Sequence, residues 1–228
     1  LASLLGIIIA MILGVFIMIG VVASMISSGD QEVVVKENTI LKIDLDYPVY
    51  DRTTNDPSAF FNGENFNMGG DPGLDDIIKS IELAAADPQI KGIYLSNPSI
   101  NAGAAQILEI RKALEKFKSS GKFIMAYTTG YDQKGYYLAS VADEVYVHPE
   151  GMILFKGLSA ELMFFKGTLE KLEVEMQVIR HGKFKAAVEP FILDKMSDEN
   201  REQYTALITS VWNDMLKDIS TSRNITMA

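Results

Sequence analysis

The sequence has 228 residues, 48% hydrophobic and 22% charged, with 21 basic and 30 acidic side chains and a formal net charge of −9. This composition excludes a disordered, collagen-like or small disulfide-linked protein, and the acidic excess predicts that nucleic acid is not a partner. Because the chain contains no cysteine, disulfides, thiolate metal sites and catalytic thiols are excluded as well.

The first element is a long uncharged run. No Asp, Glu, Lys or Arg precedes Asp30. As a helix rising roughly 1.5 Å per residue, such a run is long enough for the roughly 30 Å hydrocarbon core of a bilayer, and a cleavable signal peptide has a shorter apolar core. We therefore predict a transmembrane signal anchor at residues 1–29. No cluster of Lys or Arg follows it, so the globular part is expected on the exported side.

Residues 30–228 alternate short β-rich runs with amphipathic stretches, which is typical of an α/β domain. Gly, Pro, Asn and Asp concentrated between positions 48 and 73 predict a long loop. Ser197 with Asn200 resembles a helix-capping box. Strands are expected at 33–35, 39–45, 92–95, 123–127, 145–147 and 176–179, and helices at 74–85, 104–117, 135–141, 162–172 and from Ser197 for about five turns.

Common site motifs are missing from the sequence. It has no phosphate-binding glycine loop, no G-x-S-x-G elbow and no zinc-binding H-E-x-x-H, and its histidines are His148 and His181 alone. Ser140 and Ser159 are interpreted as structural residues. We therefore expect no metal ion.

One segment does suggest chemistry, because Lys183 and Lys185 lie among apolar residues just after the strand expected at 176–179. A lysine acts as a general base only when its pKa falls from about 10.4 towards neutrality, which burial and neighbouring positive charges promote. The spacing does not show which of the two lysines is enclosed. On the residues alone, a solvated lysine pair is the simpler interpretation.

The same segment, G-K-F-K-A-A-V-E-P-F followed by I-L-D-K-M-S, resembles the lysine segment of the long form of the signal peptide peptidase A (protease IV) family. These are membrane-anchored serine peptidases with a Ser/Lys dyad. The resemblance extends through G-Y-Y-L-A-S at 135–140, A-D-E-V-Y at 142–146 and P-E-G at 149–151, and covers most of residues 38–220. It implies a ClpP/crotonase-like fold, which the long form contains in two tandem copies.

The resemblance also implies the role of each part. The first copy supplies the lysine base, which corresponds to Lys185, and Lys183 becomes a neighbour that helps to depress its pKa. Residues 30–228 would be this first domain, and the second, serine-bearing domain would lie outside the chain. The implied substrates are cleaved signal peptides, the implied assembly is a homo-oligomer, and the implied place is the bacterial inner membrane with the domain in the periplasm. No cofactor is implied.

Two departures from the family pattern stand out. The serine motif S-G-G-Y aligns on 133–136, where Gln133 takes the place of the serine, and the glycine pair of the oxyanion setting is replaced at 97–100. We therefore expect this fragment alone to be inactive. The alternative is a catalytically silent, membrane-tethered interaction module. Acyl-CoA chemistry on the same fold is disfavoured, because it would need the same glycines.

Overall fold

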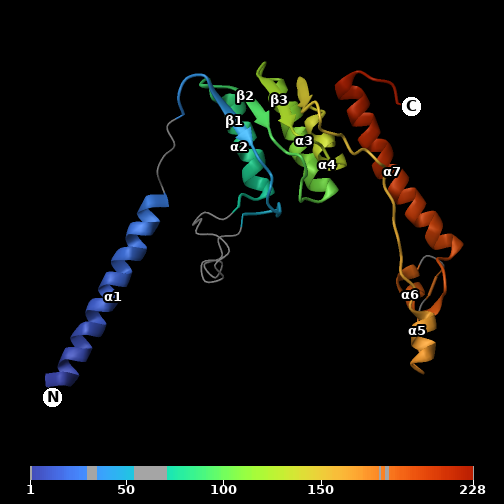
Figure 1. The fold of residues 1–228 in the computed structure, drawn as a ribbon, viewed down its shortest axis with the longest axis horizontal. Coiled ribbons are helices and arrows are strands. Elements are labelled where there is room, and N and C mark those ends of the chain that lie inside the picture. Colours follow the sequence, from blue (N-terminus) through green and yellow to red (C-terminus); the bar gives the residue numbers. More distant parts are fainter. Residues whose placement is uncertain (1, 30–34, 54–70, 180, 183–184, 228) are drawn as a thin grey trace.

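The computed structural model describes residues 2–29, 35–53, 71–179, 181–182 and 185–227 (Figure 1). It is an α/β protein built around one parallel sheet, as predicted. In chain order the elements are α1 (Ala2–Gly29), β1 (Thr39–Ile43), α2 (Leu74–Ala86), β2 (Ile90–Leu95), α3 (Ala104–Lys118), β3 (Phe123–Thr128), α4 (Gln133–Ala139), β4 (Glu144–Val147), α5 (Lys166–Lys171), the short 3-10 helix η2 (Ala186–Val188), α6 (Glu189–Ile192) and α7 (Asp198–Arg223).

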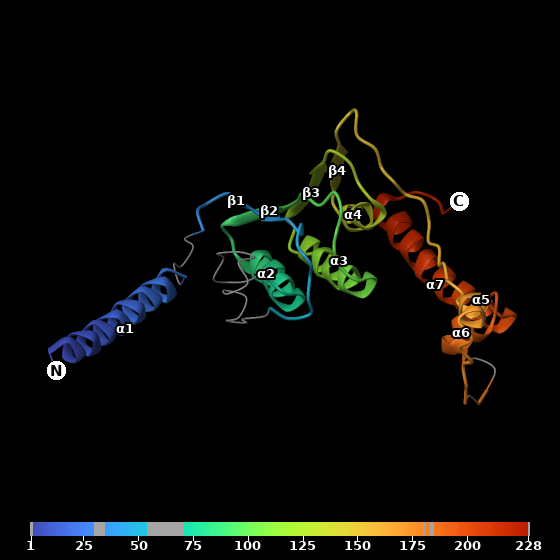
Figure 2. The same ribbon diagram turned by 60° about the horizontal axis from the view of Figure 1, so that its bottom comes forward.

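The strands lie in the order β1-β2-β3-β4, and every neighbouring pair is parallel. Ile43, Leu95, Ala126 and Val145 are register partners across the sheet. Each connection between neighbouring strands passes through α2, α3 or α4, as expected for strand-helix-strand units. These helices cover one face of the sheet (Figure 2).

The core lies between that face and the helices. α2 and α3 each have an apolar stripe at helical spacing, and both stripes are buried. In β3, Ile124 and Ala126 alternate with exposed neighbours and pack beneath the helices. The buried members of the two helices include Ile77, Ile81, Ala84, Ile107, Ile110, Leu114 and Phe117.

The opposite face of the sheet is open. Phe123 and Tyr127 are 42% and 39% exposed. Tyr146, the register partner of Tyr127, is 48% exposed, and Ile40, which lies across Gly92 from Phe123, is 45% exposed. Parallel sheets are usually covered on both faces, so this apolar and aromatic surface is unusual. Among the described residues, no helix covers it.

The C-terminal half of α7 is held to the sheet domain by Arg111 of α3, which is fully buried. Its guanidinium donates to the backbone oxygen of Asp218 at 3.1 Å and to Ser222 Oγ at 2.5 Å, both in α7. It also donates to Ser140 Oγ at 2.8 Å at the end of α4. Ser140 is therefore part of a buried polar network, in agreement with its structural interpretation.

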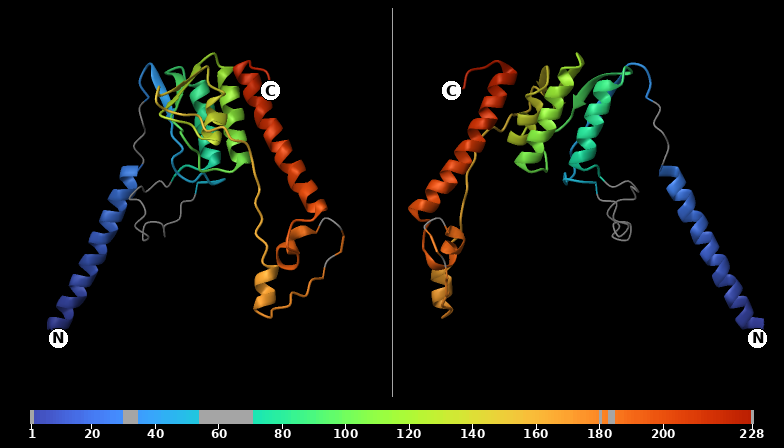
Figure 3. Two further views of the ribbon diagram at one scale, coloured as in Figure 1. Left: turned by 45° about the vertical axis from the view of Figure 1, so that its right-hand side comes forward. Right: turned by 180° about the vertical axis from the view of Figure 1, so that it is seen from behind.

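After β4 the chain leaves the sheet and forms a projection, here called the arm (residues 158–197), beside the N-terminal end of α7 (Figure 3). The arm contains α5, η2 and α6, all very short. Its large apolar side chains are exposed to an unusual extent for a folded domain. They are Leu158, Met163, Phe165, Leu172, Val174, Met176, Ile179 and Phe191.

Two expectations for this region were wrong or too broad. The strand expected at 176–179 does not form, and the helix expected at 162–172 is limited to Lys166–Lys171. A strand needs a neighbour to pair with. The four strands of the described sheet all lie before the arm in the sequence, and the segment 176–179 on the arm pairs with none of them. The helix expected at 135–141 begins earlier, at Gln133, and ends at Ala139. Positions 33–34 and most of the loop expected at 48–73 lie outside the described residues.

α1 runs from Ala2 to Gly29, and its side chains are described from Leu5 to Gly20. Within what the structure describes, no helix is sufficiently long and apolar to cross a membrane. The transmembrane segment expected at residues 1–29 therefore stays a prediction.

Candidate active site

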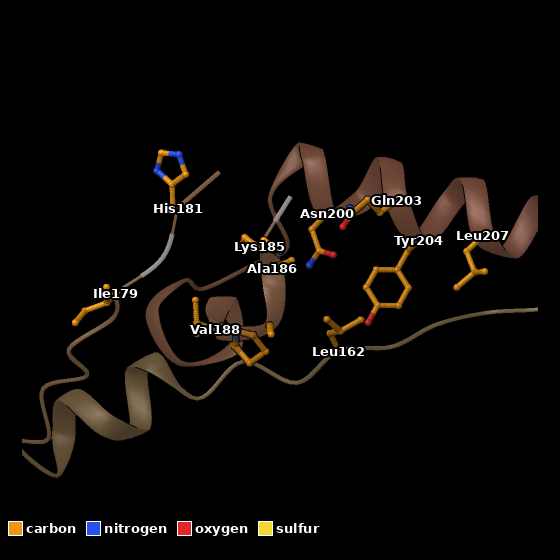
Figure 4. A pocket seen from close by; sticks show the side chains of 12 residues that line it. Leu162, Ile179, His181, Lys185, Ala186, Val188, Asn200, Gln203, Tyr204 and Leu207 are labelled. Atoms are coloured by element: carbon orange, nitrogen blue, oxygen red, sulfur yellow. The ribbon is translucent and has the colours of Figure 1, made fainter. Parts of the chain in front are cut away.

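Lys185 lies on the arm, immediately before η2. It lines a pocket of about 840 Å³ between the arm and the first turns of α7 (Figure 4). The side chain is exposed, so the chain by itself does not enclose it in the way a lysine base requires. Lys183 and Phe184 lie outside the described residues.

The walls of this pocket are largely apolar. Leu162 and Val188 come from the arm and Leu207 from α7, while Asn200 and Tyr204 add polar groups from the same helix. Figure 4 shows Asn200, Gln203 and Tyr204 projecting from successive positions of α7 on the side where Lys185 and Ala186 lie, with His181 set apart. The capping prediction for this helix is confirmed in part. Ser197 Oγ accepts the Asn200 backbone N–H at 3.2 Å, but the reciprocal bond of a capping box is replaced, because the Ser197 backbone N–H donates to Glu189.

The pocket offers a lysine but no conventional nucleophile. Among the described residues that line it, none is serine, threonine or cysteine. A lysine base in an acyl-transfer site works on such a side chain at hydrogen-bond distance. The hydroxyl that Lys185 would activate is therefore absent from the described part of this pocket.

Gln133, at the position where the sequence resemblance leads us to expect a serine, lies elsewhere. It is the first residue of α4, and its Oε1 accepts the backbone N–H groups of Lys156 at 3.2 Å and Gly157 at 2.9 Å. It lines a second cleft of about 1030 Å³, which also includes Ile100 and Leu158. No described residue lines both this cleft and the Lys185 pocket, so the two positions are not brought together.

The turn at 97–100, which replaces the family's glycine pair, has a structural role. Asn97 is buried, its Oδ1 accepts the Leu45 backbone N–H at 2.6 Å, and its Nδ2 donates to the Ile43 carbonyl at 3.2 Å. Gly135 of α4 packs directly against this turn, since a Cβ there would lie 2.5 Å from the Pro98 carbonyl oxygen. The sequence pattern showed only a chain break at this turn and gave no sign that Asn97 joins it to β1.

Two tyrosines in the core of the sheet domain have clearly raised pKa values. Burial raises the pKa of Tyr131 to about 12. Burial and the hydrogen bond that its hydroxyl donates to Asp218 at 2.5 Å also raise the pKa of Tyr137. Neither tyrosine lines the Lys185 pocket. These shifts reflect packing and mark no catalytic group.

The described residues also contain no group of three or more His, Asp or Glu side chains placed to hold a metal ion. His148 has a local contact instead, because its Nδ1 accepts the Glu150 backbone N–H at 3.2 Å. The expected lack of a cofactor stays a prediction.

Comparison with known proteins identifies relatives. Residues 116–228 match the sequence profile of peptidase family S49. Protease 4 of Haemophilus influenzae is 38% identical over 151 residues, which cover 66% of this chain and 25% of that protein. Protease 4 of Salmonella typhi is 37% identical over 153 residues, covering 67% and 25%, and the chloroplastic serine protease SPPA of Arabidopsis thaliana is 33% identical over 155 residues, covering 68% and 23%. The chain thus spans about a quarter of the length of these relatives.

Proposed function

This chain belongs to peptidase family S49, the signal peptide peptidase A and protease IV family of serine peptidases, and from that premise we propose that it supplies the general base of a Ser/Lys dyad. The base is Lys185. The serine comes from a second domain of the same protein or from a neighbouring subunit.

The observation that carries this proposal is the composition of the Lys185 pocket. The lysine stands among apolar walls with no aliphatic hydroxyl among the lining residues that are described. Gln133, at the position of the family's serine, lines a different cleft. A lysine without its hydroxyl and a serine position without its serine are what one half of a divided active site would contain.

The mechanism follows from this division. The neutral amine of Lys185 accepts the proton of the incoming serine as that oxygen attacks the peptide carbonyl, and the resulting ammonium returns the proton to the leaving amine. Water then attacks the acyl-enzyme, and the amine again takes up and returns a proton. The amine must be neutral for the first step, so a partner that covers the exposed pocket and removes its water completes the site.

Assembly is supported by the surfaces that this chain leaves uncovered. The arm exposes large apolar side chains such as Leu172 and Ile179, and the open face of the sheet exposes Phe123 and Tyr146. Apolar surfaces of this kind mark contacts with other proteins or domains. We propose that residues 30–228 form the first of two ClpP/crotonase-like domains and that the protein is a homo-oligomer.

The proposed setting is the bacterial inner membrane, with residues 1–29 as the anchor and the domain in the periplasm. The proposed substrates are cleaved signal peptides. Support comes from the uncharged sequence before Asp30 and from the apolar walls of the Lys185 pocket, which suit apolar peptide side chains.

The test is hydrolysis of a synthetic signal peptide by the full-length natural protein and its Lys185→Ala variant. Lys195→Ala is the matched control, since Lys195 is another exposed lysine of the arm and does not line the pocket. The proposal expects hydrolysis to disappear in Lys185→Ala and to persist in Lys195→Ala. Hydrolysis at the natural rate in Lys185→Ala would reject the role of this residue.

A second candidate is a silent interaction module, which is favoured by the way Gln133 is used. Its side-chain oxygen is engaged by two backbone N–H groups, as befits a residue kept for structure. The same assay separates the candidates, because the module predicts no hydrolysis by the full-length natural protein at all.

A further inference from the structure

The arm and the first turn of α7 are joined through buried polar side chains. Among the described residues from 143 to 214, the ones classed as buried are Glu189 and Asn200, each 2% exposed. No apolar side chain in that range is buried to the same degree. A carboxylate removed from water is costly unless it is hydrogen-bonded, so its partners decide how the surrounding chain is arranged.

The Glu189 carboxylate binds the start of α7. Its Oε1 accepts the Ser197 hydroxyl at 2.5 Å, and its Oε2 accepts the Ser197 backbone N–H at 3.2 Å and the Asn200 side-chain N–H at 2.8 Å. The Ser197 hydroxyl oxygen in turn caps α7. One carboxylate therefore satisfies three donors and joins α6 to the first turn of the long helix.

Glu189 is also tied closely to Lys185. One turn of 3-10 helix, η2, separates them, and the Glu189 backbone N–H donates to the carbonyl of Ala186. η2 and α6 are three and four residues long, too short to be stable by themselves. The contacts of Glu189 therefore fix where the turn that follows Lys185 lies relative to α7, which contributes Asn200 and Tyr204 to the pocket.

We propose that Glu189 is the positioning residue for Lys185. By fastening the Lys185 turn to the start of α7, its buried carboxylate holds the lysine amine where the incoming serine meets it. This inference rests on the proposed role of Lys185 as the base. Glu189 is assigned a role through position, because its described side-chain contacts are with the start of α7.

The charge of the carboxylate is what this role requires. In Glu189→Gln the charge is lost and one acceptor oxygen becomes an NH₂ group. At the Oε2 position this group would face the N–H donors of Ser197 and Asn200, and at the Oε1 position it could no longer accept from the Ser197 hydroxyl. The shape of the side chain is kept, so the change weakens the fastening and leaves the volume of the site as it was. Ser197→Ala is a milder change that deletes the hydroxyl contact to Glu189 together with the cap of α7 and leaves the other two donors of the carboxylate in place.

The experiment uses the full-length natural protein and a serine-directed phosphonate that labels the active serine irreversibly. The rate constant of labelling reports how well the lysine activates the serine, and the final extent of labelling reports the fraction of folded, assembled protein. A loss of folded protein lowers the extent and leaves the rate constant of the surviving molecules unchanged. A misplaced lysine lowers the rate constant alone.

We expect Glu189→Gln to reduce the labelling rate constant about 10- to 100-fold at an unchanged final extent, and Ser197→Ala to cause a smaller reduction. Ser222→Ala is the matched control. It deletes a serine hydroxyl that accepts from buried Arg111 at the other end of the same helix, and the rate constant should remain that of the natural protein.

A natural rate constant in folded Glu189→Gln would overturn the proposal. If Glu189→Gln does not fold, Ser197→Ala decides, and a rate constant equal to that of Ser222→Ala overturns the proposal as well. Lys185→Ala tests the underlying function separately, since retained labelling in that variant rejects the lysine base itself. If Lys185→Ala loses labelling but Ser197→Ala and Ser222→Ala have equal labelling rate constants, the lysine base stands and the role of Glu189 is rejected.

Discussion

The side-chain oxygen of Gln133 lies 2.9 Å from the backbone nitrogen of Gly157 and accepts its hydrogen bond, so the first residue of α4 holds the chain just where the arm begins. Gly157 has a positive φ of 96°, a conformation that L side chains rarely adopt. The glutamine thus fixes a sharp change of direction between the sheet domain and the arm.

Replacing Gln133 by serine should not create a peptidase. Gln133→Ser in purified residues 30–228 would place a hydroxyl in the second cleft, away from the Lys185 pocket, and leave the N–H groups of Lys156 and Gly157 without their acceptor. We expect no hydrolysis and a loss of about 1–3 kcal/mol in the free energy of unfolding, measured by urea denaturation. Lys134→Ser, at the exposed neighbouring position, should cost less. Hydrolysis by Gln133→Ser would contradict the separation of the two positions.

Arg111 should be the most sensitive point for the docking of α7. Arg111→Met removes a buried charge but leaves its acceptors in α7 and at the end of α4 unpaired. We expect a loss of about 3–5 kcal/mol in the free energy of unfolding, read from urea denaturation. Arg201→Met, at an exposed position of the same helix, is the control and should have little effect. Equal stabilities of the two variants would show that the network does not hold α7.

How far the sequence specifies this structure differs between the sheet domain and the arm. Alternating burial in the strands and apolar stripes in the helices are local patterns, so α2, α3, β2 and β3 were predicted to within about two residues. The run at 176–179 has the composition of a strand, but pairing depends on a neighbour that local pattern does not reveal. It lies on the arm, away from the four-stranded sheet.

The site was predicted less completely than the fold. The residues alone left Lys183 and Lys185 equal, and only the family resemblance chose Lys185. Asn97 and Glu189 were missed as organising residues because their roles depend on contacts. Asn97 binds Leu45, which is 52 positions away, and no local pattern records such a contact. A glutamate beside a proline looks like an ordinary helix start until its burial is known.

Acid should weaken the contact between β3 and the segment before β4. Although partial burial raises the pKa of Asp143, the hydrogen bond from the Ile124 backbone N–H and the ion pair with Lys118 outweigh it and lower that pKa below its usual value. The carboxylate therefore contributes stability above the unfolded-state pKa of about 3.9, and this contribution is lost as pH falls through the lower folded-state pKa.

Asp143→Asn provides the corresponding measurement. At pH 7 the variant should unfold at a lower urea concentration than the natural sequence, and the gap should narrow as pH falls below about 4. Asp75→Asn, at an exposed position in the first turn of α2, is a control for general effects of removing one charge. If the difference in unfolding urea concentration between the two proteins stays constant with pH, the ionised form of Asp143 adds no stability to the folded protein.

The exposed arm should drive self-association of this domain. Leu172, directly after α5, is 66% exposed and Leu83 on α2 is 62% exposed, so they form a matched pair on the arm and on the sheet domain. We expect Leu172→Glu to lower the weight-average molar mass of the purified protein, measured by sedimentation equilibrium at high concentration, because a charge at this position opposes apolar contact. Leu83→Glu should leave it unchanged. If Leu172→Glu and Leu83→Glu have the same molar mass in solution, self-association uses a surface other than the arm.

The most direct test of the divided site is to locate the reactive serine. The full-length natural protein is labelled with the serine-directed phosphonate, digested and mapped by mass spectrometry, beside its Lys185→Ala variant. The label is expected on a serine outside residues 1–228 and should disappear in Lys185→Ala. A label on any serine within residues 1–228, or full labelling without Lys185, would contradict it.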